Sequence, residues 1–405
     1  MAGPLEGIRV VEVASWMFIP SGGSVLVDWG ADVIKVEPMT GDPQRGLITS
    51  GLLPGGAGGV NFMVEQPHRG KRSIGLDLAH PDGREALMKL VETADVFLTN
   101  YLPPIRRKLQ IDTDDIRARN PNIIIARGSG TGPKGPDAEK GGYDGASFWA
   151  RGGMGMTMPE REGGWPPGQP TAAFGDVMGG LATAGAIAAA LLKRERTGEA
   201  SVVDVSLLAT AMWQLSPMVI ASKLFGFSKI PQGDRTKNPN PGVGTYRTKD
   251  DRFIALILLQ SDKFWADLVT RLGLPEMIDD ERFADSAARA QNAEECIKRL
   301  DEAFGSRTLA EVTEAFEGFE GVWSPFQTLD ELYDDVQVQA NGYLPAMTAS
   351  NGDEVQLVAS PAQFDEVPIE VTRAPEHGEH TELLLMDLGY DWDQIAALKE
   401  SGAVL

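Results

Sequence analysis

The amino-acid sequence predicts an α/β protein with a large, doubly wound, mostly parallel sheet and a smaller α+β domain. Short runs rich in β-branched residues alternate with helical stretches along the first half of the chain, and the connections between them are brief. This alternation is typical of parallel strands covered on both faces by crossover helices. The first two strands are expected at Ile8–Ala14 and Ala31–Glu37, where the runs are almost continuously apolar.

The elements between and after these strands follow from the same patterns. A Gly/Ser-containing turn is expected at Pro20–Ser24, followed by a helix to about Trp29. His80 precedes Pro81, and proline is tolerated in a first helical turn, so a helix is expected from there to about Thr93. The other elements of this half are expected as strands at Ser73–Leu78, Asp95–Asn100 and Ile123–Gly128, and a helix at Asp112–Arg119.

The residue composition changes from Gly128 to Gly175, which is rich in glycine, proline and aromatic residues and has little hydrophobic periodicity. This pattern indicates a long functional loop region. A helix is expected from Val177 to Arg196, with Gly198 as its C-terminal cap. Later elements are expected as strands at Ser201–Val205, Phe253–Leu259 and Val355–Ser360, a linker at Gly233–Gly244, and helices at Leu207–Phe225, Asp262–Leu272, Ala287–Phe304, Thr308–Glu317 and Glu379–Leu388.

These patterns predict four segments. Residues 1–200 form the N-terminal part of the large domain, and residues 201–226 form a linker helix. Residues 227–325 form the small domain, and residues 326–405 form a linker and a C-terminal return to the large domain.

Charge and cysteine content exclude several classes of function. The chain has 58 Asp and Glu against 37 Lys and Arg, a net charge of −21, which argues against nucleic-acid and anionic-membrane partners. Its single cysteine, Cys296, excludes an intrachain disulfide and a thiolate-rich metal site. The N-terminus lacks signal-peptide features, and the longest apolar stretch, Leu181–Leu192, is too short to span a membrane. A cytoplasmic protein is therefore expected.

Familiar catalytic and cofactor motifs are missing from the sequence. There is no HExxH, GxSxG or metal-ligand cluster, and the turn after the first strand does not match the GxGxxG of a Rossmann dinucleotide site. The glycine-rich Gly55–Gly59 lacks the flanking strand and helix of a phosphate-binding loop. His377 and His380 are expected at the surface, and His80 is expected to cap its helix.

One carboxylate, Asp176, falls where the glycine-rich loop meets a long apolar helix. It could be an ordinary N-cap residue. It could also be a covalent nucleophile toward an acyl group, because a helix N-terminus favours the charged carboxylate and the flanking glycines allow close approach of a ligand. The local sequence does not separate these two interpretations.

Several short motifs occur along the chain in a characteristic order and spacing, namely Leu5–Val10, Gly30–Glu37, Arg69–Ile74, Ala94–Val96, Arg119–Pro121, Phe174–Asp176 and Glu195–Glu199. In these motifs the whole chain resembles the class III CoA-transferases, the family of formyl-CoA transferase and carnitine CoA-transferase, whose fold is shared by α-methylacyl-CoA racemase. The resemblance implies a large Rossmann-like domain and an interlocked homodimer.

The resemblance implies an acyl-CoA:carboxylate CoA-transferase in which Asp176 forms aspartyl anhydride and aspartyl-CoA thioester intermediates. The alternative is a racemase or epimerase of the same family, which uses a histidine in a Gly-His-Asp motif. The matching segment here is Gly142-Tyr143-Asp144, and a tyrosine is a poor base at neutral pH. A non-catalytic acyl-CoA-binding protein is a further alternative, with Asp176 as a cap.

By the same resemblance, coenzyme A and acyl-CoA are substrates and no cofactor is bound permanently. Pro38 and Ala79 stand where the family commonly has basic residues. Either Arg45, Arg72 or Arg106 then holds the CoA phosphates, or the affinity for CoA is lower. An apolar acyl pocket or ordinary packing would explain Phe148, Trp149, Met154, Met156, Met158 and Trp165. The residues implied to contact CoA are Met17, Phe18, Leu76, Asp77, Leu78, Asn100, Lys108 and Tyr143.

Overall fold

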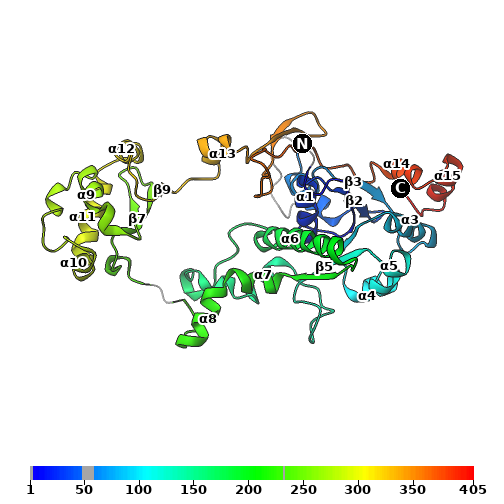
Figure 1. Ribbon diagram of the computed structural model, residues 1–405, viewed down its shortest axis with the longest axis horizontal. Coiled ribbons are helices and arrows are strands. Elements are labelled where there is room, and N and C mark those ends of the chain that lie inside the picture. The colour runs from blue at the N-terminus through cyan, green and yellow to red at the C-terminus, as the bar shows by residue number, and fades with distance from the viewer. Residues whose placement is uncertain (1–2, 48–58, 231–232) are drawn as a thin grey trace. The chain divides into compact units, whose positions relative to one another are not determined.

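The computed structural model describes residues 3–47, 59–230 and 233–405, and the chain forms two compact units (Figure 1). One unit comprises Met1–Ile230 together with Val336–Leu405, and the other comprises Pro231–Asp335. The first unit contains the large sheet. Most of Gly55–Gly59 lies outside the described residues.

The large unit is built on a six-stranded sheet in the order β3-β2-β1-β4-β5-β6, in which every neighbouring pair is parallel. The predicted α/β fold with a doubly wound parallel sheet is confirmed. The strands are β1 (Arg9–Val13), β2 (Asp32–Glu37), β3 (Arg72–Gly75), β4 (Val96–Thr99), β5 (Ile124–Ser129) and β6 (Val202–Ser206).

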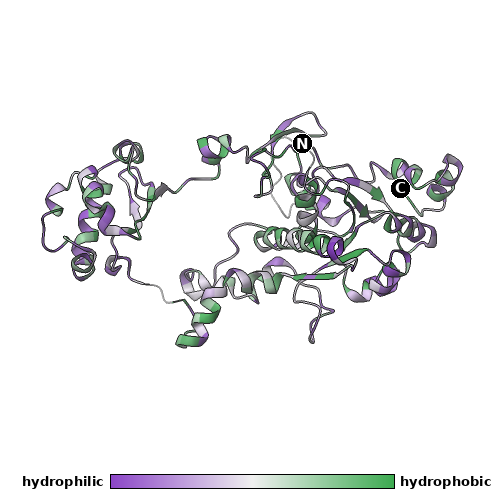
Figure 2. Cartoon of the chain, viewed as in Figure 1, coloured by the Kyte–Doolittle hydropathy of each residue, from purple (hydrophilic) through white to green (hydrophobic). Residues whose placement is uncertain are grey.

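The side chains of successive residues in the buried strands point to opposite faces of this sheet and pack in two separate cores. Val10 and Val33 pack in one core with α1 and α6, whereas Val11 and Ile34 pack in the other with α3, α5 and α14. Figure 2 shows the apolar character of the central strands and of α6. The helices of this unit are α1 (Phe18–Asp28), α2 (Phe62–His68), α3 (Pro81–Glu92), α4 (Pro103–Leu109), α5 (Thr113–Arg119), α6 (Phe174–Thr197), α7 (Leu207–Gln214), α8 (Ser216–Phe225), α13 (Val336–Ala340), α14 (Thr381–Asp387) and α15 (Trp392–Glu400).

The strand order changes direction between β1 and β4, which lie side by side at the centre of the sheet. In open α/β sheets, ligands bind in the crevice outside the carboxyl ends of the strands at such a switch point. The turns that follow β1 and β4 begin at Ala14 and Asn100. The two turns are joined by Asn100, whose side chain accepts from Ser15 N at 3.1 Å and donates to Ser15 O at 2.7 Å.

Glycine allows α1 and α6 to pack closely. A Cβ on Gly22 would lie 2.9 Å from the carbonyl oxygen of Gly180, and one on Gly180 would lie 2.0 Å from Ser21 Oγ. The expected turn at Pro20–Ser24 is therefore wrong, because these residues are helical and their small side chains serve a helix–helix contact.

Other boundaries also differ from the sequence-based expectations. The expected helix over Leu207–Phe225 is divided at Leu215 into α7 and α8, where Pro217 stands in the first turn of α8. Helix α6 begins at Phe174, three residues before the expected Val177. Helices α4 and α15 were not expected from the sequence, and the C-terminal α14 packs near β3 (Figure 1).

The smaller unit packs an antiparallel sheet, in the order β7-β8-β9, against helices around one apolar core. Cys296 is buried in that core. A separate two-stranded ribbon, β10 (Ala346–Thr348) with β11 (Glu354–Gln356), belongs to the large unit. The elements of the smaller unit are β7 (Val243–Arg247), β8 (Phe253–Ile257), α9 (Ser261–Arg271), α10 (Ser286–Gln291), α11 (Ala293–Gly305), α12 (Leu309–Ala315) and β9 (Trp323–Pro325).

One helix of the described residues, α6, has the length and apolar composition that a membrane span requires. In the structure it packs along α1 and contacts α7, β5 and β6.

Candidate active site

A cavity of about 340 Å³ opens at the carboxyl ends of β1, β4 and β5, where the sheet topology places a ligand site. Residues from the turns after these strands meet Tyr143 and the start of α6 there. Among the predicted site residues, this cavity brings together Phe18, Asn100, Tyr143 and Asp176. Its full lining is Ser15, Trp16, Phe18, Pro43, Asn100, Tyr101, Leu102, Ile105, Gly128, Ser129, Gly130, Gly141, Gly142, Tyr143, Asp176 and Leu207.

Asp176 lies in the first turn of α6 and is not its N-cap. The N-cap position is Ala173, in a left-handed conformation with φ 61°, and it makes no side-chain capping bond. Burial, reinforced by the neighbouring charge of Asp144, raises the pKa of Asp176 to about 7. The interpretation of Asp176 as the N-cap residue is therefore wrong, because Ala173 occupies that position.

Asp144 supplies the cap that α6 lacks locally. Its carboxylate accepts from Gly175 N through both oxygens, at 3.1 Å each, and also accepts from the amide of Asp176. Burial raises the pKa of Asp144, and these hydrogen bonds oppose that rise. The sequence offered a signal for Asp144, because this carboxylate directly follows Tyr143, but no role was assigned to it.

The glycine before Asp176 makes room for this carboxylate. A Cβ on Gly175 would lie 2.2 Å from the Phe148 ring and 2.5 Å from Asp144 Oδ1. The space at Gly175 is therefore filled by protein, and the expectation that this glycine admits a ligand to the backbone is wrong.

Tyr143 stands at the exposed side of the cavity, with 66% of its surface accessible. Its ring meets the indole of Trp16 edge to face, with the centroids 5.8 Å apart and an interplanar angle of 90°. Trp16 was not predicted as a site residue, although it directly precedes the predicted pair Met17–Phe18.

A second cavity of about 320 Å³ is lined by other predicted CoA contacts, Leu76, Asp77 and Leu78. Pro38 and Ala79 lie in the same lining. The two cavities share Tyr101 in their linings. Most of the predicted site residues are therefore divided between two cavities that have Tyr101 in common.

Two predicted CoA contacts lie in neither cavity. Met17 is buried in the chain, with 6% of its surface exposed, just before α1. Lys108 is exposed on α4 and makes no ion pair within the described part of the chain. The arginines considered for the phosphates all have carboxylate partners, namely Arg45 with Glu37, Arg72 with Asp32 and Arg106 with Asp112.

The residues considered for an acyl pocket, Phe148, Trp149, Met154, Met156, Met158 and Trp165, do not line the cavity with Asp176. Phe148, Trp149 and Met154 are buried in the core beneath α6, so the packing interpretation holds for them. Met156, Met158 and Trp165 are exposed.

The histidines lie away from the cavity. His80 caps α3 by accepting from Asp82 N at 3.2 Å, as the sequence predicted. His377 and His380 are half-buried rather than exposed, because they contact Pro38 O and Ser73 N respectively. Within residues 3–47, 59–230 and 233–405, no cluster of His, Cys, Asp and Glu is arranged to hold a metal ion.

Known proteins and one protein family match nearly the whole chain. The family model "CoA-transferase family III" matches residues 5–381. The (R)-2-hydroxy-4-methylpentanoate CoA-transferase of Clostridioides difficile is 34% identical, and the match covers 99% of each chain. The cinnamoyl-CoA:phenyllactate CoA-transferase of Clostridium sporogenes is 30% identical, with 99% of this chain and 97% of the relative covered.

Solved structures give the same result for the fold. A crystal structure of Rv3272 from Mycobacterium tuberculosis superimposes with a TM-score of 0.79 at 29% identity, covering 95% of this chain and 99% of that one. A CAIB/BAIF family protein from Brucella suis gives a TM-score of 0.79 at 29% identity, with 96% of this chain and 100% of that one covered.

Proposed function

The chain belongs to CoA-transferase family III, and we propose that this enzyme moves coenzyme A between carboxylic acids through covalent intermediates on Asp176. The observation that carries the proposal is the position of Asp176. It is a half-buried carboxylate in the first turn of α6, in the lining of a cavity at the switch point of the sheet. Such a group is both accessible to a thioester and shielded from bulk water.

The first half of the reaction transfers CoA to the enzyme. A carboxylate oxygen of Asp176 attacks the thioester carbonyl, the C–S bond breaks, and CoA leaves as a thiolate. The thiolate then attacks the aspartyl carbonyl of the mixed anhydride, which releases the donor acid as a carboxylate. The product is a thioester between CoA and Asp176.

The second half repeats these steps with the acceptor. The acceptor carboxylate attacks the aspartyl thioester and expels the CoA thiolate, which then attacks the acyl carbonyl of the new anhydride. The acceptor leaves as its CoA thioester and the carboxylate of Asp176 is restored. Each step exchanges one activated acyl group for another, so the energy of the thioester is conserved.

Asp144 supports this chemistry by fixing the first turn of α6. Its bonds to the amides of Gly175 and Asp176 hold the backbone that carries the nucleophile. The negative charge of Asp144 also raises the pKa of Asp176, which makes the nucleophile more basic when it is ionised.

The cavity favours a monocarboxylic, largely apolar acyl group. Trp16, Ile105 and Leu207 contribute apolar surface, and the described lining contains no Lys, Arg or His. A dicarboxylic acyl chain would need a cation for its second carboxylate. Two relatives support this substrate class, since one is a CoA-transferase for a methyl-branched hydroxy acid and the other is a CoA-transferase for phenyllactate.

We assign the adjoining cavity to the nucleotide end of CoA. Its Leu76–Leu78 segment and the shared Tyr101 place it next to the cavity with Asp176. Phe18, Asn100 and Tyr143 would then lie along the pantetheine. Met17 and Lys108 have no part in this assignment, because neither lines these cavities.

A homodimer completes the proposal. Helix α8 carries exposed apolar side chains, including Ile220, Leu224 and Phe225, each at least 60% exposed, which is unusual for a surface without a partner (Figure 2). A second copy of the chain, interlocked with the first, would cover this face. We expect the enzyme to act in the cytoplasm without a membrane or nucleic-acid partner.

Intact-protein mass spectrometry after incubation with a panel of acyl-CoAs tests the proposal. Wild type should gain the mass of a CoA thioester with its preferred donor, and Asp176→Ala should not. Asp114→Ala, which removes an exposed carboxylate on α5, is the matched control and should gain the adduct. Wash-in of α-deuterium from D₂O without an adduct would instead indicate the racemase, although no histidine of the described residues lines the cavity.

A further inference from the structure

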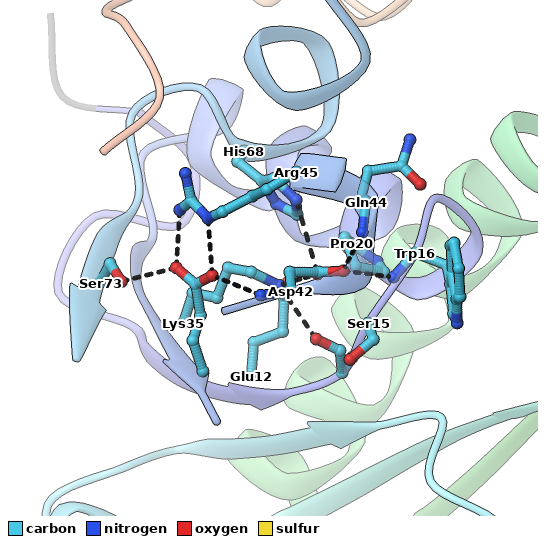
Figure 3. Close-up of polar contacts among 12 residues, drawn as sticks. Glu12, Ser15, Trp16, Pro20, Lys35, Asp42, Gln44, Arg45, His68 and Ser73 are labelled. Carbon is cyan, nitrogen blue, oxygen red and sulfur yellow. Dashed lines mark hydrogen bonds and ion pairs between the residues drawn. The ribbon is translucent and has the colours of Figure 1, made fainter. Parts of the chain in front are cut away.

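A cluster of charged side chains is buried beneath the turn that joins β1 to α1 (Figure 3). Lys35 Nζ lies 2.7 Å from Asp42 Oδ2 and 3.6 Å from Glu12, and Lys71 Nζ lies 2.7 Å from Glu12. All of these residues are at most 3% exposed. Glu37 and Arg45 extend the cluster, so that its acidic and basic side chains balance.

This cluster holds the main chain of the turn at successive points. Lys35 Nζ donates to Ala14 O at 3.0 Å, at the end of β1. Asp42 Oδ1 accepts from Trp16 N at 3.1 Å, and Lys71 Nζ donates to Pro20 O at 2.8 Å in the first turn of α1. The turn is therefore fixed before, at and after Trp16.

Trp16 needs such support because its backbone is strained. Its φ of 69° lies in the left-handed region, which a bulky residue other than glycine rarely adopts. Strain of this kind persists only where the surrounding structure imposes it, and it gathers at functional sites. Here the amide of Trp16 is held by Asp42, and the preceding Ser15 is held by Asn100.

The strained conformation places the indole at the wall of the cavity that contains Asp176. The ring of Trp16 meets Tyr143 edge to face there. Tyr143 is otherwise largely exposed, so the indole is a principal support for its ring. Tyr143 in turn directly precedes Asp144, which fixes the start of α6.

We propose that Asp42, anchored by Lys35, is a positioning residue that keeps Trp16 in its left-handed conformation and so holds Tyr143 over the cavity with Asp176. The inference rests on the proposed CoA transfer. If Asp42 served only to stabilise the fold, its carboxylate would not need to accept a hydrogen bond from the amide of Trp16, the strained residue at the cavity. Asp32, which lies on β2 with Lys35, pairs with Arg9 and Arg72 and makes no bond to this turn, so it separates the two roles.

The main test replaces Trp16 by glycine and by phenylalanine. Glycine adopts positive φ without strain, so Trp16→Gly should retain or gain thermal stability. Its kcat should nevertheless fall at least about tenfold, because the ring that supports Tyr143 is gone and small misplacements are costly in a reacting geometry. Trp16→Phe keeps an aromatic edge and should retain kcat within about threefold. A Trp16→Gly enzyme as active as wild type would overturn the inference.

The second test follows the position of the indole directly. In protein labelled with 5-fluorotryptophan, the ¹⁹F resonance that disappears in Trp16→Phe is that of Trp16. In Asp42→Asn the side-chain amide nitrogen would face Lys35 Nζ in place of the carboxylate oxygen that anchors Asp42, so this resonance should shift or broaden. It should remain in place in Asp32→Asn. The kcat of Asp42→Asn should fall more than the KM for the donor rises, whereas Asp32→Asn should match wild type.

The outcomes distinguish the two proposals. If wild type forms no CoA adduct with any donor, the proposed function fails, and the ¹⁹F resonance still tests the link from Asp42 to Trp16. If wild type transfers CoA but the Trp16 resonance is unchanged in Asp42→Asn, only the positioning role fails. Should Asp42→Asn not fold, a Trp16→Gly enzyme as active as wild type would still overturn the inference.

Discussion

Asp144 accepts a hydrogen bond from the amide of Gly175 through each of its carboxylate oxygens, at 3.1 Å. Asp144 thus links the segment that follows the cavity residue Tyr143 to the start of α6. It caps the helix from a distant part of the sequence, and it places a negative charge beside Asp176, the residue that follows Gly175.

Replacing Asp144 by asparagine separates these two functions. The amide oxygen of Asn can still accept from Gly175, but the charge that raises the pKa of Asp176 is lost, so this pKa should fall. The acid limb of the kcat/KM profile should therefore move to lower pH. Asp144→Ala should in addition lose about 1 kcal/mol of folding stability with the cap. An unchanged acid limb in Asp144→Asn would contradict the electrostatic role.

The pH dependence of the wild-type enzyme follows from the pKa of about 7 at Asp176. Only the ionised carboxylate attacks a thioester, so kcat/KM should rise with pH through this value. At pH 6 it should be about one tenth of its plateau. Steady-state kinetics from pH 5.5 to about 9 would measure this, and a profile that is flat down to pH 5.5 would exclude Asp176 as the titrating group.

The same pKa has a consequence for stability. The pKa of Asp176 is raised from 3.8 in the unfolded chain to about 7, so the folded state binds the proton more tightly. The associated stability is present below about pH 4 and is lost as pH rises through 7. Asp176→Asn should match wild type near pH 4 and be more stable at pH 8, by on the order of 2 kcal/mol. Thermal unfolding at both pH values would measure the difference, and equal stability at pH 8 would contradict the cost of ionising Asp176.

The sequence predicted the features that depend on residues close together in the chain, and it did not predict those that depend on contacts between distant residues. Runs such as those containing Val10 and Val33 predicted the parallel sheet, because strand periodicity and burial are local signals. The family motifs predicted Asp176 as the nucleophile, and the structure places this residue in the lining of the cavity. The role of Gly22 was not predictable, since the partner that requires a small residue there, Gly180, lies far along the chain.

The site residues that were missed share this dependence on distant contacts. Asp144 acts on α6 across an intervening loop, and no local pattern marks a cap supplied from elsewhere. Trp16 matters because of a backbone conformation that Asp42 imposes. The sequence also did not predict that Met17 is buried in the interior and lines neither cavity.

Two glycines of α6 provide a matched pair of substitutions. In Gly175→Ala the new Cβ would meet Phe148 and Asp144 at 2.2 and 2.5 Å, so the first turn must shift. We expect a loss of about 1–3 kcal/mol in folding stability from overpacking, together with a large loss of activity. In Gly185→Ala the Cβ would meet nothing within 4 Å. That variant should gain about 0.5–1 kcal/mol and keep its activity. Chemical denaturation and turnover of both variants would test this, and equal effects would refute the special role of Gly175.

The exposed face of α8 leads to a prediction about assembly. Ile220 and Leu224 are 60% and 71% exposed, and a monomer would leave this apolar surface in water. Light scattering after size-exclusion chromatography should find wild type as a dimer. The double variant Ile220→Lys/Leu224→Lys should be recovered largely as monomer, because a dimer would bury two unpaired charges on each chain. Trp392→Lys, on α15 and 62% exposed, is the control and should remain dimeric. A double variant that is still fully dimeric would show that α8 lies outside the interface.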